Sequence, residues 1–256
     1  MTFEIDTLNL PMELHLTINA ARPCIINIKG KEGDNRKNVY FSRSYGFRND
    51  DSKLVHGTKK FVIPMPLTPK SLIIDIKNDI GYDNVQLVDI KAHPLAKKSD
   101  LWLDATDREF IDFIFKFAPA LHAVDDNDIW ASTSEKFIIR CLPVIQNRET
   151  KEILNTPARI NRLTGIIEIN NNKLKSYTVF MRIVILFHEY FHWKLNTKIE
   201  QEADYNALNW FLSLGFPQTE AMYAFTRVFP KDSKGLKQRE LDNINFIKNF
   251  HAQSAR

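Results

Sequence analysis

Hydrophobic and polar residues alternate along the first 95 residues, which is the pattern of strands with one buried face. Six short runs show it, at residues 13–18, 25–28, 38–41, 61–64, 72–76 and 85–90. Segments rich in glycine, proline, asparagine and aspartate lie between the runs and favour tight turns. The pattern predicts a small antiparallel β-sandwich over residues 1–95.

Beyond residue 95 the hydrophobic residues recur at helical spacing over longer stretches. They predict helices at residues 108–117, 174–195, 198–214, 218–229 and 240–250. Two strands are predicted among them, one at 137–145 and one centred on 165–169. We therefore expect an α+β protein with two domains, a β-sandwich for binding or docking at 1–95 and a domain with a small sheet and long helices at 96–256.

The predicted helix at 174–195 carries the sequence HEYFH, with two histidines four residues apart. Residues at this spacing lie on one face of a helix, so the imidazoles of His188 and His192 can reach one Zn²⁺ ion. Glu189 flanks that face, where its carboxylate can take a proton from a metal-activated water and deliver it to a leaving amine. The alternative is a pair of core histidines that hydrogen-bond to backbone carbonyls.

A catalytic zinc site needs a third protein ligand, and carboxylates are the nearest candidates. The short segment after the histidines predicts a helical hairpin, in which Glu200 lies opposite His192. One turn further along, Asp204 lies opposite His188, where it can accept the outer N–H of a bound imidazole. Glu200 is thus the first candidate for the third ligand, and Glu202 and Asp204 are the fallback ligands.

A structural role competes with metal binding for Glu200. The sequence TKIE at 197–200 has the form of a capping box, in which Thr197 caps the new helix and Glu200 reaches back to its first amide. Both interpretations begin a helix at the same place, and we favour the ligand.

Peptide hydrolysis at a metal also needs a group that stabilises the oxyanion. Tyr177, Tyr205, His122 and His251 carry suitable side chains, and nothing in the sequence ranks them. An aromatic residue on a helix is more often part of the core than a catalyst.

The sequences HEYFH and EQEAD resemble the signature of the gluzincin metallopeptidases, HExxH followed by ExxxD or ExxAD, as in thermolysin and the small ImmA/IrrE-like peptidases. The resemblance covers residues 156–214. It implies that 96–256 is a zincin-like metallopeptidase domain whose active-site helix carries the first motif.

By this resemblance the zinc ligands are His188, His192 and Glu200. Glu189 is then the general base. Asp204 does not bind the zinc but accepts a hydrogen bond from one of its imidazole ligands. The resemblance also implies an edge strand above the site that can pair with an extended peptide, and residues 165–170 stand in the right order for it. The spacing between His192 and Glu200 is shorter than in most gluzincins.

Composition narrows the class of protein. With 44% hydrophobic and 26% charged residues, the chain is typical of a globular protein. The two cysteines, Cys24 and Cys141, exclude a disulfide framework and a cysteine-rich metal site. The net charge of +4 comes from scattered basic residues, which does not favour a nucleic-acid partner.

No apolar stretch approaches the roughly 20 residues of a membrane span. The amino-terminal sequence lacks the pattern of a signal peptide, so we expect a cytoplasmic protein.

Two functions remain open. The first is a zinc-dependent endopeptidase or amidase that hydrolyses a protein or peptide substrate recruited by the sandwich. The second is a zincin-fold structural protein, catalytically silent or of narrow specificity, that meets its assembly partners through the sandwich. The motif, the sandwich and the segment from Gly215 onwards are also similar to gluzincin-like proteins of tailed phages, including crAss-like phages, which implies a virion neck or tail component.

Overall fold

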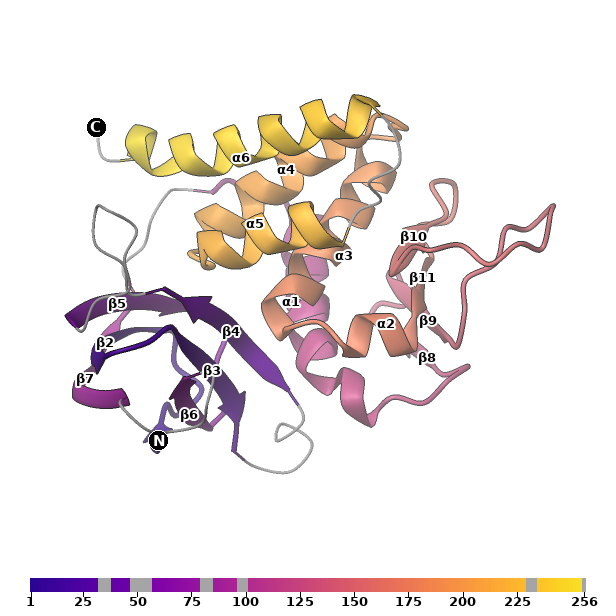
Figure 1. Ribbon diagram of the computed structural model, residues 1–256. Helices are drawn as coiled ribbons and strands as arrows, with labels where there is room; N and C mark the ends of the chain where they lie inside the picture. The colour runs from indigo at the N-terminus through magenta and orange to yellow at the C-terminus, as the bar shows by residue number, and fades with distance from the viewer. Residues whose placement is uncertain (32–37, 47–56, 79–84, 96–100, 229–233, 255–256) are drawn as a thin grey trace. The chain divides into compact units, whose positions relative to one another are not determined.

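The computed structural model describes residues 1–31, 38–46, 57–78, 85–95, 101–228 and 234–254. Contacts divide the chain into two compact units, Met1–Lys97 and Lys98–Arg256 (Figure 1). Strands build the first unit, and helices with a small sheet build the second. The α+β prediction is confirmed.

The first unit consists of two antiparallel sheets, with strand orders β1-β6-β3-β4 and β5-β2-β7. The strands are β1 Thr2–Asp6, β2 Met12–Ala20, β3 Cys24–Gly30, β4 Val39–Tyr45, β5 Gly57–Met65, β6 Ser71–Asn78 and β7 Val85–Pro94. Alternate residues of β2, β3 and β6 are buried, as a sandwich core requires. The sequence pattern missed β1, because this short edge strand contains no fully buried side chain.

The second unit combines helices with a four-stranded sheet of order β10-β11-β9-β8. The strands are β8 Ile129–Ala131, β9 Ile138–Leu142, β10 Ala158–Ile160 and β11 Ile167–Asn170. The helices are α1 Ala105–Ala120, α2 Asn171–Lys175, α3 Val179–Lys194, α4 Glu200–Ser213, α5 Gln218–Arg227 and α6 Lys234–Ser254, with a 3₁₀ turn at Leu121–Ala123. Helix α3 contacts α1, α4 and α5, and α6 contacts α4 (Figure 1).

The single helix predicted at 174–195 is wrong, because the chain breaks it into α2 and α3. The hydroxyl of Thr178 accepts a hydrogen bond from the backbone N–H of Met181 at 3.2 Å and so begins a new helix. Hydrophobic periodicity continues across the break, since Leu174 and Val179 are both fully buried. A short polar cap therefore divides a stretch that the hydrophobic pattern alone joins.

The expected edge strand at 165–170 is also corrected. Strand β11 lies inside the sheet, between β9 and β10, and β10 forms the edge. In the hairpin that joins β10 to β11, Gly165 has a φ of +70°, and a Cβ there would lie 3.2 Å from the indole nitrogen of Trp193. Both the positive φ and the close contact favour glycine where the hairpin packs against α3.

A buried aspartate fixes α1 to α3. Asp107, in the first turn of α1, forms a reciprocal capping box with Asp104. Its carboxylate also accepts a 2.7 Å hydrogen bond from the hydroxyl of Tyr190 and forms an ion pair with Lys194. Both residues are on α3. Because Asp107 is 2% exposed, these partners replace the water that it loses on folding.

We expect Asp107→Ala to lower the free energy of unfolding of the second unit by about 2–3 kcal/mol, because it removes one of the two hydrogen bonds of the capping box and leaves the Tyr190 hydroxyl without its acceptor. Tyr190→Phe keeps the cap and should cost only about 1 kcal/mol. All four tryptophans lie after residue 100, so denaturant titration followed by tryptophan fluorescence reports this unit. Equal losses in the two variants would contradict the cap.

Candidate metal centre

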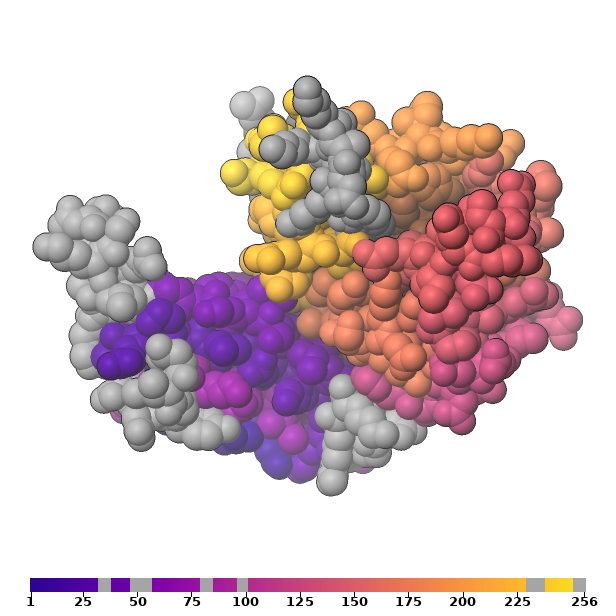
Figure 2. Space-filling model, turned by 45° about the vertical axis from the view of Figure 1, so that its right-hand side comes forward, coloured from indigo at the N-terminus to yellow at the C-terminus, as the bar shows by residue number. Residues whose placement is uncertain are grey.

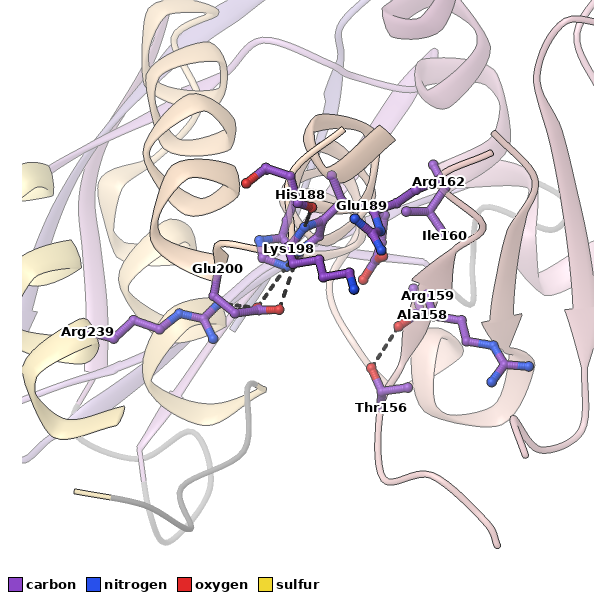
Figure 3. A pocket seen from close by; sticks show the side chains of 12 residues that line it. Thr156, Ala158, Arg159, Ile160, Arg162, His188, Glu189, Lys198, Glu200 and Arg239 are labelled. Atoms are coloured by element: carbon purple, nitrogen blue, oxygen red, sulfur yellow. Dashed lines mark hydrogen bonds and ion pairs between the residues drawn. The ribbon is translucent and has the colours of Figure 1, made fainter. Parts of the chain in front are cut away.

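Three side chains from the α3–α4 hairpin meet in a cleft of about 460 Å³. Helix α3 supplies His188 and His192, and Glu200 is the first residue of α4. Strand β10 forms one wall of the cleft, and Glu200 and Arg239 lie on the opposite wall (Figure 3). On the molecular surface, the red region of β10 and β11 lies beside the orange surface of α4 (Figure 2).

The distances between the three side chains suit a metal ion. The Nε2 atoms of His188 and His192 are 3.0 Å apart, and they lie 3.4 and 3.5 Å from the two carboxylate oxygens of Glu200. A tetrahedral ion with bonds of 2.0–2.1 Å separates its ligand atoms by about 3.3 Å. His188, His192 and Glu200 can therefore hold a metal ion.

The outer ring nitrogens decide which tautomer each histidine adopts. The Nδ1 atom of His188 lies 2.8 Å from Oδ1 of Asp204, and that of His192 lies 3.0 Å from the carbonyl oxygen of Thr197. Both oxygens act only as acceptors, so each Nδ1 carries the proton. The Nε2 lone pairs of the neutral rings then face each other at 3.0 Å, and only a cation between them, a proton or a metal ion, relieves the repulsion.

The charges around the histidines favour a cation. Burial opposes protonation of His188, but its hydrogen bonds to Asp204 and Glu200 outweigh this effect and raise its pKa from 6.5 to about 9. Burial likewise opposes ionisation of Glu200, yet the two histidines and Arg239 lower its pKa. The cluster therefore carries a bound proton at neutral pH when no metal is present.

Helix α6 supports the site through an arginine that the sequence motif did not reveal. Asp204 is fully buried, and its oxygens accept hydrogen bonds from Nε and Nη2 of Arg239 at 2.5 and 2.7 Å and from Nδ2 of Asn243 at 2.8 Å. Arg239 Nη2 also lies 3.0 Å from Glu200. Arg239 and Asn243 thus hold Asp204 against His188, and Arg239 orients the candidate ligand Glu200.

Glu189 lies beside the histidines and lines the same cleft. It is 7% exposed, and burial is the main cause of its raised pKa. The neighbouring Glu200 raises the pKa further, whereas the histidines and a hydrogen bond from the backbone of Ile160 oppose the shift. A carboxylate whose pKa is raised is a stronger base, which suits it to accept a proton from a nearby water.

The structure distinguishes Glu200 from Glu202 and tests the capping box expected for Glu200. Glu202 accepts a 2.6 Å hydrogen bond from the hydroxyl of Thr197 and is not part of the three-residue cluster. Helix α4 has Ile199 as its N-cap, without a side-chain hydrogen bond. The capping box expected between Thr197 and Glu200 is therefore absent from this described segment.

None of the suggested oxyanion residues with a described side chain lines the cleft. Tyr205 accepts a hydrogen bond from Gln201 and stacks on Phe246. His122 lies 3.0 Å from the guanidinium of Arg182, and Tyr177 is half-buried. The side chain of His251 lies outside the described residues.

Four basic side chains line the cleft instead, and the sequence analysis did not single them out: Arg159, Arg162, Lys198 and Arg239. They come from three separate segments, so no local motif joins them. The basic lining is a property of the tertiary structure.

No family model, curated protein or solved structure matches this chain. Among the helices in the described part of the chain, none combines the length and the hydropathy needed to cross a membrane. The function of the cleft is therefore inferred from its own side chains.

We expect Glu200→Gln to weaken Zn²⁺ binding by at least about 100-fold, because it removes a charged ligand. Even the residues that hydrogen-bond to metal ligands contribute about 10- to 100-fold in affinity. Competition with a chelator of known affinity measures the change. Glu202→Gln is the matched control, since it makes the same substitution on the same helix outside the cluster, and it should bind like the wild type. Similar losses in both variants would contradict the ligand set.

Metal affinity should rise with pH. Below a pKa of about 9, His188 must release a proton before its Nε2 can bind a metal. The apparent dissociation constant for Zn²⁺ should therefore fall about tenfold per pH unit from roughly pH 6 to pH 9. Calorimetry in buffers of different ionisation enthalpy should detect at least one proton released per ion at pH 7, and no release would argue against this protonation state.

Proposed function

We propose that the protein is a zinc-dependent metallopeptidase. The observation that carries the proposal is a cluster of three protein donors beside a buried carboxylate, Glu189, in an open cleft. Structural zinc sites are closed by four protein ligands, whereas catalytic sites use three and leave one position open. A carboxylate next to that open position has a use only if a proton is to be moved there.

The donor set supports zinc in particular. Two imidazoles and one carboxylate form the ligand set of several zinc peptidases, and each imidazole here has the outer acceptor that such ligands require. When bound, zinc would supply a Lewis acid that polarises the scissile carbonyl and lowers the pKa of water.

Glu189 performs the proton transfers of the proposed reaction. Its carboxylate takes a proton from the attacking water, which then adds to the carbonyl carbon of the peptide bond. The same carboxyl group delivers the proton to the leaving nitrogen, and the C–N bond breaks to give an acid and an amine. The burial that raises the pKa of Glu189 makes its carboxylate a stronger base for the first of these transfers.

Strand β10 provides a way to hold an extended peptide. In its pairing with β11, Arg159 lies opposite Glu168, and the flanking backbone hydrogen bonds involve Pro157 and Asn161. Antiparallel strands alternate in this way, so the backbone groups of Ala158 and Ile160 face the cleft. A substrate that adds to this edge as a strand lies across the histidines.

Glu189→Gln should keep stoichiometric zinc and lower kcat on a peptide library or casein by about 10²- to 10⁴-fold, because glutamine cannot carry the proton. Zinc content by mass spectrometry and turnover are measured on the same preparations. Turnover close to that of the wild type would contradict the role of Glu189. Stoichiometric zinc in the wild type without turnover of any substrate would favour the zincin-fold structural protein.

A further inference from the structure

We call the cleft that contains His188, His192 and Glu200 the metal cleft. A second cleft, of about 470 Å³, adjoins it at the end of β10. Three arginines line it, Arg148, Arg159 and Arg162, and none of its lining residues is acidic. Arg159 and Arg162 also line the metal cleft, so the two clefts are neighbours along this edge. We call the second cleft the arginine cleft.

The arginine cleft carries an excess of positive charge. Arg148 and Arg159 share one carboxylate, that of Glu168, at 3.4 and 2.6 Å. Arg162 has no carboxylate within ion-pair distance in the described part of the chain. Three guanidinium groups against one carboxylate leave about two positive charges facing the cleft.

The turn that carries Arg162 has a defined conformation. The side-chain oxygen of Asn161 accepts hydrogen bonds from the backbone N–H groups of Leu163 and Thr164 at 3.0 and 3.3 Å, and its carbonyl accepts one from Gly165 at 2.8 Å. Close packing of Gly165 on α3 fixes the hairpin from the other side. Arg162 is thus attached to an ordered backbone, which lowers the entropy cost of binding a ligand.

We propose that the arginine cleft binds an acidic side chain of the peptide substrate, with Arg162 as the residue that determines this specificity. The proposal rests on the proposed peptidase function. The proposed reaction takes place at the histidines, in the cleft that Ile160 also lines, and Arg162 follows Ile160 by two residues. Because an extended peptide advances about 3.3 Å per residue, we expect the acidic residue within about two positions of the bond that is cut. Arginine suits this role because its planar guanidinium can bind both oxygens of a carboxylate.

The test uses quenched fluorescent peptides with amidated carboxyl ends, which differ only by Asp or Glu against Asn or Gln at each position near the cleavage site. For the wild type, kcat/KM should favour the acidic peptide by about tenfold or more at one position, mainly through KM. Arg162→Gln should reduce this preference at least about fivefold, as expected when a charge-assisted hydrogen bond is lost. Arg108→Gln, an exposed change on α1, should retain it.

A preference that persists in Arg162→Gln, or hydrolysis by the wild type with no acidic preference, would overturn the proposal. A second series of the same peptides has free carboxyl ends. A preference seen only in that series would also overturn the proposal, since the cleft would then bind a terminal carboxylate.

A binding measurement separates this proposal from the proposed function. Fluorescently labelled acidic and neutral peptides are titrated with zinc-loaded Glu189→Gln, with and without Arg162→Gln, and followed by anisotropy. Tighter binding of the acidic peptide that depends on Arg162 supports the arginine cleft even if the wild type cuts no peptide, a result that would overturn the peptidase alone. Equal binding of the two peptides would refute the arginine cleft.

Discussion

The structure of the site depends on two imidazole lone pairs that face each other inside the protein. Asp204 and the carbonyl of Thr197 hold the outer nitrogens of His188 and His192, so neither ring can rotate its N–H inward without losing a buried partner. The repulsion between the inner nitrogens then favours a cation bound between them. Glu200 adds a negative charge beside these nitrogens, on the wall of the cleft.

Elements outside the α3–α4 hairpin hold this site in place. A fully buried carboxylate such as Asp204 has a large desolvation cost, which Arg239 and Asn243 offset from α6. The opposite wall depends on β10, which the hairpin turn and Gly165 hold against α3. The three candidate ligands are thus close in sequence, while the groups that support and surround them are not.

That distinction explains what the sequence could predict. The positions of His188, His192 and Glu200 follow from helical spacing and a short reversal, and Asp204 follows from the same symmetry. Arg239 and β10 depend on how distant segments pack, for which one sequence holds no periodic signal. The break before α3 was missed because one capping hydroxyl, on Thr178, outweighed a hydrophobic pattern that runs through it.

The compactness of the cluster along the chain also bears on how the protein folds. All three candidate ligands lie between residues 188 and 200, so bringing them together closes only a short loop and costs little chain entropy. If the site binds a metal ion, a nascent hairpin would be able to bind it before β10 or α6 is in place. Such binding to partly folded chains would reduce the stability that the ion adds to the native state, because only binding that discriminates against the unfolded chain contributes.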